Sequence, residues 1–405
     1  MNTQKFIEKI IVLGFALFCF YTFGGGIFHV IGSGYVLIII GLLITTYYLT
    51  SKKALFAKLN YKALFIYIIL WIFMLISLTQ TQNLSYGKYK VFWVLAFILV
   101  SFLFSPILIR HLYFFMICNL FFLLLYLVAL HVEYGNIDHV MSEYGGVRLS
   151  MEDENDFGPI SIGRYLVLNI LNLVFLNYYT FIYRKRFKYL LLTFSIILLG
   201  YVSIYIFFTG TRSPIIAFIL AFFLYFVLRP KSFRLRNFVS ILGVFLILGM
   251  SIYFVGKYIN ASGHDAVDEF VVDRYDNPDI AFEGRMVVFE RAIKLISLDY
   301  SLIIGEGAGN YGFLLTGISN IKSFPHNIFL EILVENGFIA LILFLYIIAQ
   351  ICYRNLFMEF SSKYMYLIVI FYFMLINAQS SNDLVGNGLV FAFSAILLNI
   401  PKSNV

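Results

Sequence analysis

The chain has 405 residues, of which 61% are hydrophobic and 13% are charged, and its mean hydropathy is +0.89. Soluble domains contain about 45–50% apolar residues, so this composition excludes an ordinary soluble globular protein. The formal net charge of +7 does not indicate a nucleic-acid partner, because the basic residues are distributed as in a membrane protein.

The apolar residues fall into runs of about 17–25 residues, the length that crosses the hydrocarbon core of a membrane as a helix. About twelve such runs predict an all-α polytopic membrane protein, with residues 1–405 forming a single transmembrane domain. Lys5 and Lys9 precede the first run as in a signal peptide, but no small-residue cleavage site follows, so we expect a retained span. The runs are residues 6–22, 33–50, 63–79, 91–105, 111–131, 161–183, 189–208, 214–228, 238–256, 326–350, 364–378 and 384–399.

The orientation of the chain follows from its basic residues. If the N-terminus is cytoplasmic and the spans alternate, most of the 29 Lys and Arg residues fall in cytoplasmic loops. Most of these loops are short, and short loops are where the positive-inside rule is most informative. Acidic residues then gather on the outer side. We therefore expect both termini in the cytoplasm.

Polar residues concentrate in two long outer loops, residues 132–160 and 257–325. The second lies between the ninth and tenth predicted spans and is too long for a plain connection, which suggests a function. Arg148 lies in the first loop, close to the acidic run EDEND at 152–156. That run offers carboxylates for a cation, but we favour a solvated loop. Because the polar residues concentrate in outer loops, we predict that the protein acts at the outer face of the membrane.

Two arginines lie at the outer ends of predicted spans. Arg164, in GPISIGRYLVL (residues 158–168), falls a few residues inside the sixth span. At that depth an arginine usually faces protein or water, either paired with an acid such as Glu331 or Glu335 or as part of a polar site. Arg212 falls in the tight turn TGTRSP between two spans, where it either snorkels to headgroups or contributes to a site.

The second outer loop contains a predicted amphipathic helix. EGRMVVFERAIKLI, residues 283–296, repeats apolar residues at helical spacing and carries Arg285 in its first turn. GEGAGNYG, residues 305–312, resembles a phosphate-binding loop. No Lys-Ser or Lys-Thr pair follows it and no strand precedes it, so we favour a flexible turn.

The tenth predicted span begins with FPHNIFLEILVENG and contains two carboxylates. Pro325 suits the first position of a helix. Asn327, Glu331 and Glu335 then lie on one face, and acids in a span are expected to face the interior of the helix bundle. His326 lies at the mouth of this helix. The ordinary pKa of histidine, about 6.5, suits removal of a proton at neutral pH.

Together these residues supply arginines for an anion and a histidine for a proton, at the outer surface of a membrane. Arginine is suited to bidentate phosphate contacts. A phosphate beside a long apolar tail suggests a polyprenyl pyrophosphate. A sugar that leaves such a carrier needs its pyrophosphate stabilised and the attacking hydroxyl deprotonated, which are the two functions that these residues offer.

The sequence resembles the superfamily of O-antigen polymerases and O-antigen ligases, which are bacterial inner-membrane glycosyltransferases. The resemblance rests on the number of spans, on the long outer loop before the tenth span, and on three motifs in order: TGTRSP, EGRMVVFERA and PHNIFLEILVENG. It implies a fold related to the GT-C glycosyltransferases, a periplasmic active site, an undecaprenyl-pyrophosphate-linked donor and no metal or other cofactor. Carried over by motif, His326 becomes the base, and Arg212 and Arg285 bind the pyrophosphate.

Arg148, Arg164, Asn327, Glu331 and Glu335 are additional expected substrate-binding residues. We favour a polymerase, with a lipid-linked repeat unit as acceptor, inversion at the anomeric carbon and a chain-length regulator as a further partner. A ligase that transfers glycan to lipid A-core or to protein shares the same motifs. A transporter of lipid-linked sugar is the third alternative, but it should place polar groups at the midplane of several spans. In this sequence the polar groups lie toward one face.

Overall fold

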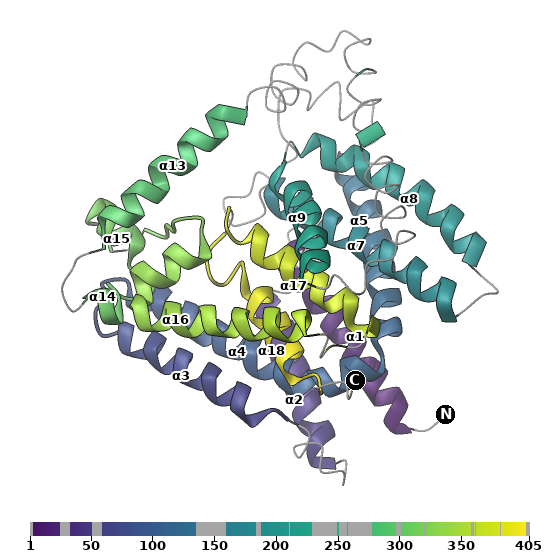
Figure 1. The fold of residues 1–405 in the computed structure, drawn as a ribbon, viewed down its shortest axis with the longest axis horizontal. Coiled ribbons are helices and arrows are strands. Elements are labelled where there is room, and N and C mark those ends of the chain that lie inside the picture. Colours follow the sequence, from purple (N-terminus) through teal and green to yellow (C-terminus); the bar gives the residue numbers. More distant parts are fainter. Residues whose placement is uncertain are drawn as a thin grey trace. The chain divides into compact units, whose positions relative to one another are not determined.

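The computed structural model describes most of the chain, and the regular structure of the described residues is entirely helical (Figure 1). The described residues are 3–24, 33–50, 59–134, 159–183, 188–209, 211–228, 249–250, 257, 278–296, 301–319, 321–357, 360, 362–380 and 382–401. The helices are α1 (Thr3–Gly24), α2 (Ser33–Thr50), α3 (Tyr61–Ser77), α4 (Leu84–Arg110), α5 (Leu112–Tyr134), α7 (Pro159–Tyr183), α8 (Lys188–Phe208), α9 (Ser213–Val227), α13 (Pro278–Lys294), α14 (Ser301–Ile304), α15 (Tyr311–Thr316), α16 (Ile328–Leu356), the 3₁₀ turn η6 (Ser362–Tyr364), α17 (Met365–Asn377) and α18 (Gly388–Asn399).

These helices confirm the prediction of an all-helical polytopic protein. A helix occupies every predicted apolar run except residues 238–256, most of which lie outside the described residues. Five helices are long and apolar enough to cross a membrane, and shorter apolar helices accompany them. The count of twelve spans therefore stays a prediction, as does the assignment of residues 257–325 to an outer loop. The five are Leu84–Arg110, Leu112–Val132, Ile160–Ile182, Lys188–Phe207 and Ile328–Leu356.

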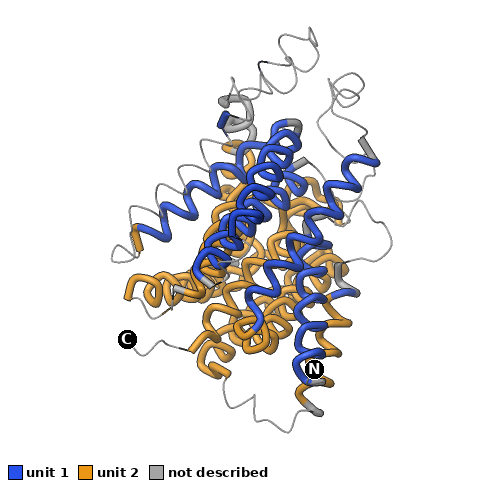
Figure 2. The backbone as a smooth tube through the Cα atoms, turned by 90° about the vertical axis from the view of Figure 1, so that its right-hand side faces the viewer, with its two compact units in different colours: residues 1–36, 111–226, 230–279 blue, residues 37–110, 227–229, 280–405 orange. Residues whose placement is uncertain are grey.

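The chain divides into two compact units, which Figure 2 shows in different colours. Unit 1 comprises residues 1–36, 111–226 and 230–279, and unit 2 comprises residues 37–110, 227–229 and 280–405. Each unit therefore combines segments that are distant in the sequence.

Unit 1 packs around α7, whose side chains are the most buried among the five candidate spans. Helices α1, α5 and α8 contact it. Asn172 of α7 donates a hydrogen bond to the carbonyl of Met116 in α5, and the rings of Tyr126 and Tyr165 meet edge to face at 4.7 Å. Polar side chains inside an apolar bundle need such partners, because an unsatisfied polar group in a membrane core is costly.

Unit 2 packs α18 against α4, and α16 against α3 and α14. Gly388 begins α18 directly against Phe97, where a Cβ atom would overlap the ring. At the other end of α18, Arg354 of α16 donates hydrogen bonds to the carbonyls of Leu397 and Leu398. These carbonyls lie in the last turn of a helix, where the usual intrahelical donors are missing. Arg354 satisfies them together with the N–H group of Ile400 and the side chain of Asn60.

Helix α16 is broken at Gly337, whose φ of 82° and ψ of 177° are not helical. A left-handed φ favours glycine, and a Cβ atom there would also lie 2.2 Å from the carbonyl oxygen of Ile303. The break leaves the carbonyls of Val334 and Glu335 without helical donors, and the N–H groups of Glu306 and Gly307 bond to them at 2.8 and 3.1 Å. Residues 328–336 are therefore a short helix of their own.

The glycine-rich stretch at 305–312 forms this contact. Gly305, Gly307 and Gly309 all have positive φ, and the stretch is largely buried against the break in α16. The prediction of a flexible turn is therefore wrong, because the turn is folded into the protein. The N–H groups of Glu306 and Gly307 bond to carbonyls of α16, and the N–H group of Gly309 bonds to the carboxylate of Glu335.

Candidate functional site

The N-terminus of α16 carries the predicted base. Asn327 is the N-cap, and its side-chain oxygen accepts hydrogen bonds from the N–H groups of Phe329 and Leu330. Pro325 therefore lies outside the helix and not at its first position. His326 is exposed, its ring packs edge to face on Phe324 at 4.6 Å, and its φ is 55°. A non-glycine residue with positive φ is uncommon and often marks a functional position.

The segment between α17 and α18 lies beside this N-terminus. The N–H group of Ile328 donates to the carbonyl of Ala378 at 3.0 Å, and the side chain of Asn327 donates to the carbonyl of Gln379. A polar stretch, QSSNDLVGN at residues 379–387, follows directly. The helix start that presents His326 is therefore fixed both by its own cap and by a second segment of unit 2.

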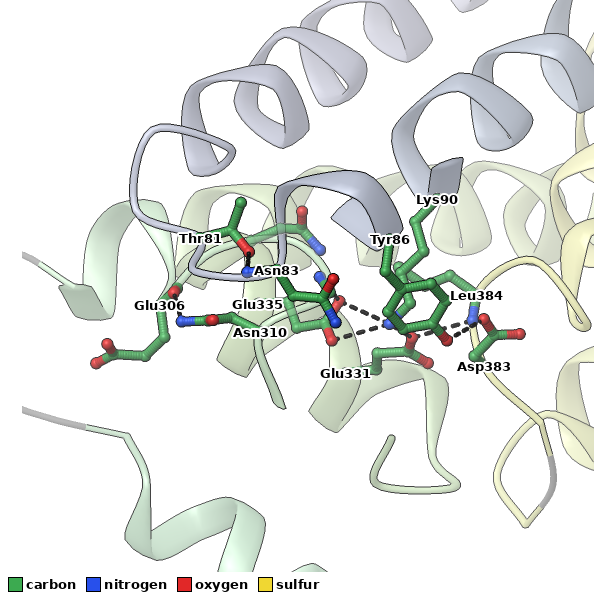
Figure 3. A network of polar contacts seen from close by, with 12 residues as sticks. Thr81, Asn83, Tyr86, Lys90, Glu306, Asn310, Glu331, Glu335, Asp383 and Leu384 are labelled. Atoms are coloured by element: carbon green, nitrogen blue, oxygen red, sulfur yellow. Dashed lines mark hydrogen bonds and ion pairs between the residues drawn. The ribbon is translucent and has the colours of Figure 1, made fainter. Parts of the chain in front are cut away.

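One turn further along α16, two carboxylates share a single lysine. Nζ of Lys90, on α4, lies 2.6 Å from Oε1 of Glu331 and 2.8 and 2.9 Å from the two carboxylate oxygens of Glu335. All three side chains have 0% exposure. Figure 3 shows Lys90 reaching the two acids from the opposite helix. The prediction that both acids face the protein interior is therefore confirmed.

Backbone donors and a tyrosine complete this network (Figure 3). Glu331 also accepts the N–H of Leu384 at 3.1 Å, and Glu335 accepts the N–H of Gly309 at 2.9 Å. Tyr86, one turn before Lys90 on α4, has its ring 4.6 Å from Nζ and donates its hydroxyl to Asp383 at 2.6 Å. The network therefore joins α4, the glycine-rich turn, α16 and the segment before α18.

The other predicted arginines that the structure describes lie elsewhere in the chain. Arg212 lies between α8 and α9 in unit 1, is half-buried, and its carbonyl accepts the N–H of Ile216 as α9 begins. Arg164 is fully buried in α7 of the same unit. Arg285 lies in α13 of unit 2, a helix that begins five residues earlier than predicted. Arg148 lies outside the described residues.

The turn that carries Arg212 is packed against the position next to Arg164. Thr209 and Thr211 are buried, and their hydroxyl oxygens lie 2.8 Å apart. A Cβ atom on Gly163 would lie 2.2 Å from the hydroxyl oxygen of Thr211. Glycine at 163 therefore allows the turn to approach α7, and the structure brings the Arg164 and Arg212 backbones into one local assembly within unit 1.

The contact between Gly163 and Thr211 allows a test of whether the position of the turn matters for activity. We expect Gly163→Ala to displace the turn that carries Arg212 and to lower glycan transfer by about 10-fold or more, because overpacking of a tight contact forces the backbone to shift. Gly200→Ala, on α8 of the same unit, is the matched control, because a Cβ atom there meets nothing within 4 Å. Transfer assays of both variants at equal membrane content measure the effect. Equal activity of the two variants would show that the turn tolerates the displacement.

Helix α13 packs with one face and exposes another. Ala292 forms a small buried cluster with Tyr311 and Val334, whereas Met286 and Ile293 are 47% and 58% exposed. The amphipathic helix expected over residues 283–296 is therefore present, although it begins at Pro278. Its packed face includes Ala292, whose small side chain permits close approach to Tyr311 and Val334.

The comparison with protein families decides the class of this protein. Residues 194–345 match the family model Wzy_C, described as O-antigen ligase. The chain contains an O-antigen ligase domain. This domain is shared by polymerases and ligases of surface-polysaccharide assembly, which are glycosyltransferases, and the resemblance drawn from the sequence motifs is confirmed for the matched residues. No curated protein and no solved structure matches the chain significantly.

The matched segment of the O-antigen ligase domain contains Arg212, Arg285, His326 and both carboxylates of α16. Lys90, Tyr86 and Asp383 lie outside it, and the sequence motifs missed them. Lys90 precedes the predicted run at 91–105, where it reads as a loop cation. Because α4 begins at Leu84, Lys90 is in fact inside a helix. The two acids in a predicted span were the signal for a buried cation, because ionisable residues in spans commonly pair with one another.

Proposed function

We propose that this protein is a surface-polysaccharide polymerase at the outer face of the bacterial inner membrane. It transfers a glycan from an undecaprenyl-pyrophosphate donor to a hydroxyl group of a lipid-linked acceptor repeat unit. The observation that supports glycan transfer is the O-antigen ligase domain, a type that polymerases and ligases share. It contains the arginine turn, the α13 arginine and an exposed histidine at a capped helix start within one matched segment.

In the proposed reaction the acceptor oxygen forms a bond to the anomeric carbon of the donor sugar. The bond from that carbon to the pyrophosphate oxygen breaks, and undecaprenyl pyrophosphate leaves with the electron pair. His326 takes the proton of the acceptor hydroxyl. Arg212 and Arg285 stabilise the negative charge that develops on the leaving pyrophosphate. Direct displacement of this kind inverts the configuration at the anomeric carbon.

In this proposal the buried residues have indirect roles and do not contact the substrate. Asn327 caps the helix, and both carboxylates of α16 are bonded to Lys90, so their burial favours an indirect role over the substrate contact expected from the sequence. Arg164 has 0% exposure and follows Gly163, against which the arginine turn packs, so we assign an indirect role to it as well. Substrate contact is assigned to His326, Arg212 and Arg285, with Arg148 as a further candidate.

A ligase is the second candidate, and the description of the matched family as O-antigen ligase favours it. In that case the acceptor is lipid A-core or a protein, and the same three residues carry out the same displacement. Both candidates use a lipid-linked glycan as donor, and a chain-length regulator is expected as partner only of the polymerase.

Surface polysaccharide from cells that lack the gene distinguishes the two candidates. Gels should compare the null strain with strains complemented by wild type or by His326→Asn. A polymerase predicts core that carries a single repeat unit in both the null and the variant. Bare core together with accumulated long lipid-linked glycan would instead establish a ligase. Normal polysaccharide in the null strain would overturn both.

A further inference from the structure

We infer that Lys90 is a positioning residue for His326, which rests on the proposed function of His326 as the base. Lys90 lies outside the matched O-antigen ligase domain, on a different helix from His326. The inference is carried by the buried contacts between Lys90 and the short helix 328–336, at whose start His326 lies.

The break at Gly337 makes this short helix depend on its contacts. A continuous helix would hold residues 328–336 in line with the long segment that follows. Because Gly337 interrupts the backbone geometry, the direction of residues 328–336 is set by what binds them from the sides. Two of these contacts are the N–H groups of Glu306 and Gly307 at the broken end.

Lys90 supplies a charged, fully buried side-chain contact to this helix. Its ammonium group bonds to both Glu331 and Glu335, at 2.6 to 2.9 Å, and these acids lie one turn apart on the face of the short helix that meets α4. Two attachment points fix both the rotation and the depth of the helix. The N–H of Glu331 in turn donates to the carbonyl of Asn327 at 2.9 Å, so the attached turn is the one that the N-cap begins.

The same network reaches the segment between α17 and α18, which lies beside the start of α16. Leu384 donates to the oxygen of Glu331 that Lys90 binds, and Asp383 accepts the hydroxyl of Tyr86, whose ring lies beside the Lys90 ammonium group. The segment that holds Ile328 and Asn327 at Ala378 and Gln379 is therefore attached to α4 as well. Removal of the ammonium group loosens both attachments of the helix start.

Reaction rate is sensitive to such movement. A displacement of about 1 Å of a catalytic group can lower the rate by about 100-fold even when the altered residue is distant from the chemistry. A displaced base lowers the rate of the chemical step, whereas a site whose arginines are intact still binds the donor. We therefore expect Lys90→Met to lower kcat by about 100-fold and to change KM for the donor little.

A neutral triple variant separates positioning from charge compensation. Lys90→Met alone leaves two buried carboxylates without their cation, which destabilises the protein. Lys90→Met combined with Glu331→Gln and Glu335→Gln removes all three charges, so we expect thermal stability near that of wild type. If Lys90 positions the helix, kcat stays low in the triple variant, because Met cannot bridge the two side chains. If the triple variant recovers the wild-type kcat, Lys90 only balances charge and the inference fails.

The experiment uses full-length protein in vesicles with the lipid-linked donor and acceptor, with kcat, KM and thermal stability measured for each variant. Lys88→Met is the matched control, because Lys88 is exposed on the same helix. His326→Asn is run in parallel. Wild-type transfer by His326→Asn would overturn the proposed function itself. Loss of transfer in His326→Asn together with wild-type kcat in Lys90→Met would overturn only the inference about Lys90.

Discussion

Replacement of His326 by asparagine should lower glycan transfer by about 10²–10⁴-fold, the usual contribution of a general base, while the protein stays folded and inserted. Asparagine is the informative substitution because the φ of His326 is 55°. Asparagine tolerates this left-handed backbone well, so the variant removes the imidazole and keeps the local conformation. Turnover of purified protein in vesicles measures the loss, with KM for the donor expected to change little.

His326→Ala provides the comparison for this variant. Alanine removes the same imidazole but resists positive φ, so it adds backbone strain at the start of α16. Equal losses in both variants attribute the effect to the imidazole. A loss in His326→Ala with near-normal turnover in His326→Asn would show that the site needs the left-handed turn, and the assignment of His326 as base would then fall.

The helical elements were predictable because their signals are local. Apolar runs of membrane-spanning length coincide with helices throughout the described residues, and the helical spacing of Glu331 and Glu335 correctly placed both acids on an inward face. The helix start was predicted to within three residues, because Ile328 and not Pro325 is the first helical residue and Asn327 is the N-cap. An Asn that precedes an apolar run is the stronger N-cap signal.

The long-range contacts were not predictable from the sequence. The break in α16 is caused by Gly337, and a single glycine in an apolar run is commonly tolerated without a break. The glycine-rich turn is ordered because its N–H groups bond to carbonyls at the break in α16. No local sequence pattern indicates these hydrogen bonds. The partner of both acids, Lys90, is 241 and 245 residues away in the chain, so only the folded structure, in which its side chain reaches α16 from α4, identifies it.

The arginine motif TGTRSP was also predictable in its local structure but not in its long-range contacts. TGTRSP was expected to separate two spans, and α8 and α9 do end and begin on either side of it. The packing of this turn against α7 could not be inferred from the sequence. It depends on the absence of a side chain at Gly163, which is 48 residues before Thr211. In the sequence, the glycine beside Arg164 is a residue of low helix propensity. In the structure, the turn packs directly against this glycine.

Arg212→Lys should lower kcat/KM for the lipid-linked donor by about 10- to 150-fold, although the charge is kept. A charge-assisted hydrogen bond contributes about 1.5–3 kcal/mol, and a lysine cannot reproduce the planar, two-donor contact of a guanidinium with a phosphate. Arg212 is half-buried in a turn fixed by Thr209 and Thr211, so the backbone cannot easily move to compensate for the different side-chain geometry. Transfer kinetics in vesicles measure the change.

Arg110→Lys is the matched control, because Arg110 is exposed at the end of α4 and bonds to the carbonyl of Pro106 in its own helix. An arginine that only snorkels to headgroups is replaced by lysine with little loss, since both side chains extend a cation to the membrane surface. Wild-type kinetics in Arg212→Lys would therefore assign Arg212 to the headgroup region. A loss confined to Arg212→Lys, strongest at low donor concentration, would show that its guanidinium binds the pyrophosphate before the sugar is transferred.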